Sequence, residues 1–180
     1  MKNFNTYISE KLKITKKKLN NNHNGHEYVD LELPSGTLWA TCNVGADEEY
    51  DNGDYFAWGE TYTKKVYGSA TYNFNKSQVK ELEPENDAAH VNMGGNWCTP
   101  TQKQFNELFE NTENNWVDNY SNTGIGGTLF TGKNGNTLFI PAAGYKSENY
   151  YHVCESSLVW TSNCSVSGDN CAFYLLCYKL

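Results

Sequence analysis

The stretch TPTQKQFNELFE at residues 99–110 holds the clearest local pattern in the chain. Thr99 is a good N-cap residue, Pro100 suits the first helical position, and Gln102 completes a capping box. Three apolar residues then follow at the spacing of one helix face, namely Phe105, Leu108 and Phe109. The sequence therefore predicts an amphipathic helix that ends near residue 110.

Predicted strands lie on both sides of this helix. Apolar and polar residues alternate in some of these segments, and an Asn-Gly turn at residues 134–135 joins two others into a hairpin. The predicted strands are residues 29–33, 38–44, 128–131, 137–140, 158–162 and 172–180. Strands, one well-capped helix and then strands again predict an α+β domain with antiparallel strands.

The N-terminus has a different character from the rest of the chain. Apolar residues at helical spacing predict a helix over residues 1–18, and three lysines at its end suit the helix dipole. A polar run rich in asparagine follows, so we assign residues 1–25 to a helix and linker and residues 26–180 to the domain. The helix is either an attachment or oligomerisation element or a packed or frayed tail.

Composition limits the partners of the protein. The 180 residues have a formal net charge of −7, and all fourteen basic residues are lysine. Nucleic-acid binding needs a basic surface, and bidentate recognition of phosphate needs arginine, so the sequence argues against both. Neither a signal peptide nor a run of about 20 apolar residues is present. We therefore expect no membrane insertion, and a location in a phage virion or in the cytoplasm of the producing cell.

Five ordered motifs between residues 28 and 180 resemble the Fibrobacter succinogenes major paralogous domain family, which is common in gut Bacteroidetes and their phages. The motifs are residues 29–46, 53–60, 83–91, 97–101 and 140–145. Two features depart from the family pattern. Cys98 stands where members usually have arginine, and a lysine-rich segment replaces the usual signal peptide.

The resemblance implies a C-type-lectin-like fold and a role in ligand binding. Some proteins with this fold are the variable proteins of diversity-generating retroelements, in which miscopied adenines turn Asn codons into codons for many other residues. Such codons cannot yield Lys, Glu, Gln, Met or Trp, and from residue 149 to residue 178 only Glu155 and Trp160 belong to that set. We assign Trp160 to the framework. The alternative for this stretch is a buried, charge-poor pair of strands.

The candidate ligand-binding residues occupy this C-terminal stretch. The predicted strand at residues 172–180 is apolar on both faces, and the family pattern assigns Ala172, Phe173 and Leu175 to the framework. Tyr174, Leu176 and Tyr178 would then form an exposed row, and a predicted loop after Tyr145 would add more tyrosines. The full predicted set is Asn149, Tyr150, Tyr151, His152, Cys154, Asn163, Cys164, Asp169, Asn170, Tyr174, Leu176 and Tyr178.

Catalytic and metal sites are weaker readings, and we predict no enzyme activity, cofactor or metal. A copper pair like that of formylglycine-generating enzymes would need Cys171 and Cys177 to meet, although ~20 Å would separate them on a straight strand. The acidic residues at 83–87 and 47–54 lack an EF-hand spacing, and Asp87 better suits a helix cap. A pair of His152 and Cys154 has no orienting third group. The alternative function is a carbohydrate-binding or adhesin domain without diversification.

Overall fold

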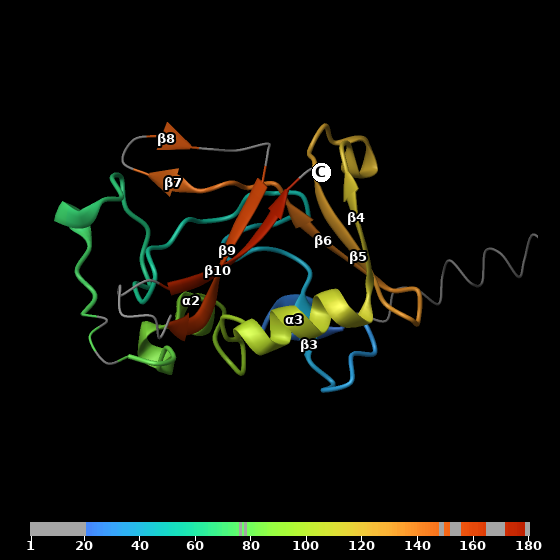
Figure 1. Cartoon of the computed structure of the whole chain (residues 1–180), viewed down its shortest axis with the longest axis horizontal. Coiled ribbons are helices and arrows are strands. Elements are labelled where there is room, and N and C mark those ends of the chain that lie inside the picture. The colour runs from blue at the N-terminus through green and yellow to red at the C-terminus, as the bar shows by residue number, and fades with distance from the viewer. Residues whose placement is uncertain are drawn as a thin grey trace, which may run out of the picture.

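The computed structural model describes residues 21–75, 77, 79–147, 150–151, 156–164 and 172–178, with backbone alone for 150–151 and 172–178. Within these residues the chain is a mixed α and β structure whose strand pairs are all antiparallel, apart from one isolated parallel bridge. Figure 1 shows a helix, α3, lying below strands that run across the molecule. The predicted α+β class is confirmed. The predicted helix at residues 1–18 lies outside the described residues.

An N-terminal meander forms the first sheet, from β1 (Asn22–His23), β2 (His26–Asp30) and β3 (Leu38–Ala40). β1 occupies part of the segment that we predicted to be a linker. Its place is set by distant contacts, because the Trp97 indole N–H donates to the His23 carbonyl at 2.9 Å and the Asn96 N–H donates to His23 Nε2 at 3.0 Å. These partners lie more than seventy residues away, so local sequence does not reveal them.

The second sheet has the order β4–β5–β6, with β4 at Glu113–Val117, β5 at Gly127–Thr131 and β6 at Thr137–Pro141. The predicted hairpin is confirmed as β5–β6. β4 was not predicted, because its sequence ENNWV begins with three exposed polar residues and has no apolar alternation. Pairing with β5 along its whole length makes this segment a strand.

Helical segments lie between the strands of the first and second sheets and within the second sheet's sequence. η1 (Ser69–Thr71) and η2 (Pro84–Asn86) are single turns between β3 and α2, α2 spans Ala88–Met93, and η3 spans Tyr120–Asn122 between β4 and β5. The predicted helix α3 is present at Gln102–Asn111, but its N-cap is Thr101, whose side chain forms a capping box with Gln104. The assignment of Thr99 and Gln102 to the cap was wrong by two residues.

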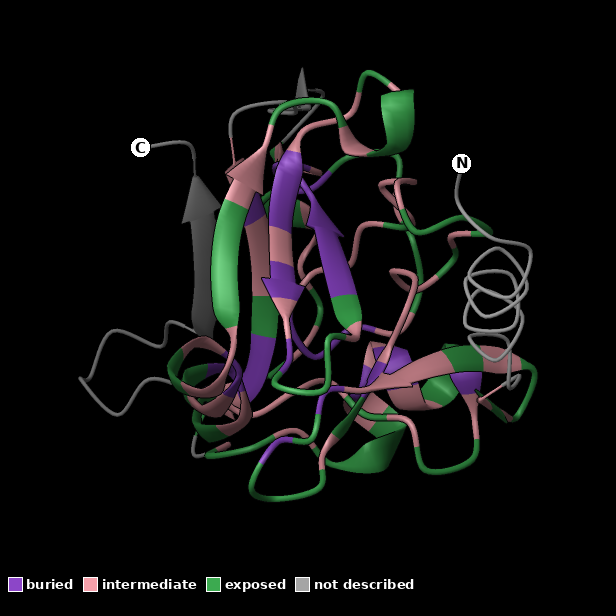
Figure 2. Ribbon diagram, turned by 90° about the vertical axis from the view of Figure 1, so that its right-hand side faces the viewer, coloured by how far each residue is buried: buried purple, intermediate pink, exposed green. Residues whose placement is uncertain are grey.

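The core forms where α3 meets the sheets. Phe105 and Leu108 of α3 are buried against residues from β3, β5, β6 and the segment after β2. The buried residues of this cluster are Leu31, Leu33, Trp39, Phe105, Leu108, Phe130, Leu138 and Ile140. In Figure 2 buried residues concentrate on β5 and β6, with exposed residues in the surrounding loops. This rigid core supports the C-terminal strands.

The C-terminal part of the structure contains β7 (Lys146–Ser147), β8 (Tyr150–Tyr151), β9 (Ser156–Cys164) and β10 (Ala172–Tyr178). β9 and β10 pair antiparallel, and α3 lies against this pair (Figure 1). Both closing strands are therefore confirmed. The segment that we predicted as a loop after Tyr145 instead contains the β7–β8 pair. Among the described residues no helix is long and apolar enough to cross a membrane.

Candidate ligand-binding surface

Strand β9 has one buried face and one more open face. Ser157 and Thr161 are almost completely buried, Val159 packs against the core cluster, and the Ser157 hydroxyl donates to the Pro141 carbonyl. The alternate residues Leu158 and Trp160 are half-buried and exposed, respectively. Since side chains alternate along a strand, residues 157–161 of β9 separate the core from an outer face, whereas Ser162 and Cys164 farther along that face are buried.

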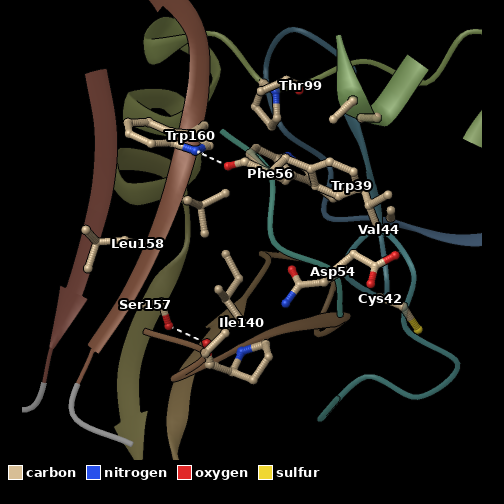
Figure 3. Close-up of a pocket in the computed structure, with 18 of the residues that line it drawn as sticks. Trp39, Cys42, Val44, Asp54, Phe56, Thr99, Ile140, Ser157, Leu158 and Trp160 are labelled. Carbon is tan, nitrogen blue, oxygen red and sulfur yellow. Dashed lines mark hydrogen bonds between the residues drawn. The ribbon is translucent and has the colours of Figure 1, made fainter. Parts of the chain in front are cut away.

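Trp160 is the prominent residue of that outer face. Its side chain is 38% exposed, yet its indole N–H donates to the Phe56 carbonyl at 2.9 Å (Figure 3). The hydrogen bond fixes the ring while part of its surface stays open to solvent. A fixed aromatic surface can bind a partner at low entropic cost. Sequence reasoning assigned Trp160 to the framework alone and did not predict this exposure.

The backbone register of β10 on β9 locates the predicted exposed row. Tyr174 pairs with Trp160, Leu176 with Leu158, and Tyr178 with Ser156. Directly opposed residues in an antiparallel pair belong to the same face of the sheet. The register therefore assigns this row to the face that carries Leu158 and Trp160.

The alternate positions of β10 have the opposite assignment. Leu175 pairs with Val159, which packs on the core, and Cys177 pairs with the buried Ser157. A register shift lies between Ala172 and Tyr174. Across this shift β9 advances by four residues and β10 by two, so the difference is even and the faces of the two strands stay matched.

The segment after β6 approaches the beginning of β9. The Gly144 N–H donates to the Ser156 carbonyl at 2.7 Å, and Gly144 forms a parallel bridge with Ser157. Tyr145, the next residue, is 41% exposed. The β7–β8 pair follows directly and contains Tyr150 and Tyr151. The structure therefore brings the residues just before Tyr145 beside the start of β9.

Two predicted site residues lie at the far end of β9 and do not suit a binding surface. Cys164 is 8% exposed and its backbone N–H donates to the Lys80 carbonyl, so burial removes its thiol from the candidate surface. Asn163 is half-buried, and its side-chain oxygen accepts the Gln102 N–H at 2.9 Å. Its amide group also donates to Glu81 at 3.4 Å. The Asn163 side chain fixes the start of α3, so its role is structural.

The remaining predicted site residues, Asn149, His152, Cys154, Asp169 and Asn170, lie outside the described residues. So do the His152–Cys154 pair and Cys171 of the copper pair, both of which the sequence argued against. In the described part of the chain, Cys42 and Cys98 are free thiols. Burial raises the pKa of the Cys42 thiol, with nearby glutamates adding to the shift, so this cysteine stays protonated at neutral pH.

The acidic cluster before α2 has a structural role. Asp87 is buried and accepts hydrogen bonds from the Ala89 and His90 N–H groups at the start of α2. Its carboxylate also accepts two bonds from Thr99. The predicted helix cap is confirmed, and His90 bonds within the fold to the Trp97 carbonyl. No group of three potential metal ligands occurs among the described residues.

A cavity of about 460 Å³ lies behind β9, between it, β3, β6 and the segment around Phe56. Figure 3 shows Trp160, Phe56 and Trp39 in a row on one side of this cavity, with Ile140 and Ser157 on the other. No sequence motif predicted this cavity, because the residues that line it come from segments far apart in the chain.

Comparison with protein-family models finds no match, and no curated protein or solved structure matches the chain.

Proposed function

We propose that this protein is a ligand-binding module with a C-type-lectin-like fold. Its binding surface is the outer face of β9–β10 together with the adjoining β7–β8 segment. The partner is a protein or glycan on a cell surface, and we assign no catalytic residue. The N-terminal segment would attach the module to a larger assembly or to other copies.

One observation carries this proposal, the pairing of the predicted Tyr174, Leu176 and Tyr178 row with the open face of β9. That face contains Trp160, which is fixed by its bond to Phe56 and still exposed. Tyrosine and tryptophan are rigid, amphipathic side chains that bind proteins and sugar rings well. The strands rest on a packed core, so residues on the outer face can vary without loss of the fold.

The diversification part of the proposal rests on the motif resemblance and on the residue types of the C-terminal stretch. The test is the encoding DNA and its neighbourhood. A diversified protein has a nearby near-identical repeat that differs at adenines, together with a reverse transcriptase gene. If neither is present, the protein is a carbohydrate-binding or adhesin domain with a constant site, for which the anchored Trp160 ring would be a sugar-stacking platform.

Binding itself is tested with the purified full chain on a glycan array and on intact gut Bacteroidetes cells. We expect a specific signal that falls at least tenfold in Tyr174→Ala/Tyr178→Ala, since a few aromatic residues carry most of an interface's energy. Tyr62→Ala is the control, because Tyr62 is also exposed but lies in the segment around η1, outside the strands of the proposed surface. Equal losses in the double variant and the control would refute the proposed surface.

A further inference from the structure

The cavity behind β9 has the size and lining of a small-molecule site. Its volume of about 460 Å³ falls within the ~300–1,000 Å³ usual for such sites. Its lining includes the exposed residues Asp54 and Tyr145, so a small molecule could enter it from solvent. The side chains around it are mainly apolar, including Val44, Phe56, Ile140 and Val159. A space of this kind favours an apolar occupant over water.

One wall contains a polar group that lacks a partner. Trp39 is 7% exposed, and its indole nitrogen is buried with no hydrogen-bond acceptor among the described residues. The ring is held by a tilted contact with Phe105, with 5.2 Å between the ring centroids. A buried N–H without an acceptor is rare and costly in a native protein. An oxygen atom on an occupant of the cavity would satisfy it.

The charged and polar groups at the cavity further define the occupant. Thr99 uses both its donors on Asp87, and the Lys146 ammonium donates to the Lys64 carbonyl at 3.2 Å and lies over the Tyr67 ring. Asp54 lies at the exposed edge of the lining. Its negative charge would repel an anion. The lining therefore suits an uncharged molecule.

We infer that this cavity is a second binding site, which takes an uncharged, mainly apolar ring compound with one carbonyl or hydroxyl oxygen. That oxygen accepts the hydrogen bond of Trp39 Nε1. The site lies behind β9, and its lining shares Leu158 and Trp160 with the surface proposed above. A small molecule there would support Trp160 and Val159 from within.

The test uses Prodan, a neutral naphthalene ketone whose emission moves to shorter wavelength in an apolar site. We expect saturable binding of one molecule per chain. Val44→Phe, which places a ring in the cavity, should abolish it. Val91→Phe is the matched control, since Val91 is exposed on α2 outside the lining, and it should bind as the native chain does.

The hydrogen bond to Trp39 is tested with Trp39→Phe, which keeps an aromatic ring and removes the N–H. Prodan should bind about fivefold more weakly, as expected for one lost neutral hydrogen bond. Two competitors of nearly equal shape provide the control, 2-acetylnaphthalene with an oxygen and 2-ethylnaphthalene without one. Their affinity ratio in the native chain should change about fivefold in Trp39→Phe.

A second measurement does not depend on the folding of Val44→Phe. In a ¹H–¹⁵N spectrum the Trp39 indole signal is the one missing from Trp39→Phe, and Prodan should move it downfield. Absence of saturable binding to the native chain would overturn the inference. So would binding that leaves this signal in place, or an unchanged competitor ratio.

Discussion

Replacing Asp87 with alanine should remove the hydrogen bonds that join α2 to the segment before α3. The buried carboxylate accepts four hydrogen bonds, from the N–H groups of Ala89 at 2.9 Å and His90 at 3.2 Å, and from the N–H and hydroxyl of Thr99 at 2.7 Å each. Loss of an N-cap costs about 0.5–2 kcal/mol. Each lost bond to a charged group costs roughly 1.5–3 kcal/mol.

These terms do not add fully, because alanine also removes a buried carboxylate whose desolvation opposes folding. We therefore expect Asp87→Ala to lower the free energy of unfolding by about 3–5 kcal/mol, which is in the upper range for one substitution. Urea unfolding followed by circular dichroism measures it. Glu85→Ala is the control, since Glu85 is exposed, and we expect a change below about 0.5 kcal/mol.

A loss below about 1 kcal/mol in Asp87→Ala would refute this reasoning. Measurements with and without calcium distinguish a helix cap from a metal ligand. If Asp87 acts through its hydrogen bonds, the difference between the native chain and Asp87→Ala is the same in calcium and in a chelator. If the carboxylate held calcium, the chelator would remove most of that difference.

Three further predictions concern single residues. Thr101→Ala should lower stability by about 1 kcal/mol in urea unfolding, because it removes the cap of α3; no change would mean that Thr101 is not the cap. Gly127→Ala should cost about 2 kcal/mol, since its Cβ would lie 2.4 Å from the Ile140 carbonyl oxygen, whereas Gly68→Ala, with open space, should cost less than half as much. Burial, followed by the bond to Glu49, raises the pKa of Tyr120 from 10.0 to about 12. Tyr120 therefore contributes stability below pH 10 that is lost between pH 10 and about 12, and this alkaline loss should shrink in Tyr120→Phe in urea titrations at several pH values; an equal loss in both proteins would contradict the assignment.

The sequence by itself was sufficient to predict α3, the β5–β6 hairpin, the α2 cap and the two closing strands. Their patterns repeat over a few residues, so they depend on near neighbours. Alternation along β10 also divided Leu175 and Cys177 from Tyr174, Leu176 and Tyr178, as the observed register does. Both sets are apolar, so the choice of the outward set came from the family resemblance.

Only the tertiary structure decided which of the possible local partners were used. Thr99 had the chemistry of a helix cap, but Asp87, twelve residues earlier, takes both of its donors, and the cap moves to Thr101. Polar β4 is a strand because β5 pairs with it. The burial of Cys164, the exposure of Trp160 and the unpaired N–H of Trp39 likewise arise where distant segments pack together. Such contacts depend on three-dimensional proximity, which hydrophobic periodicity along one segment does not encode.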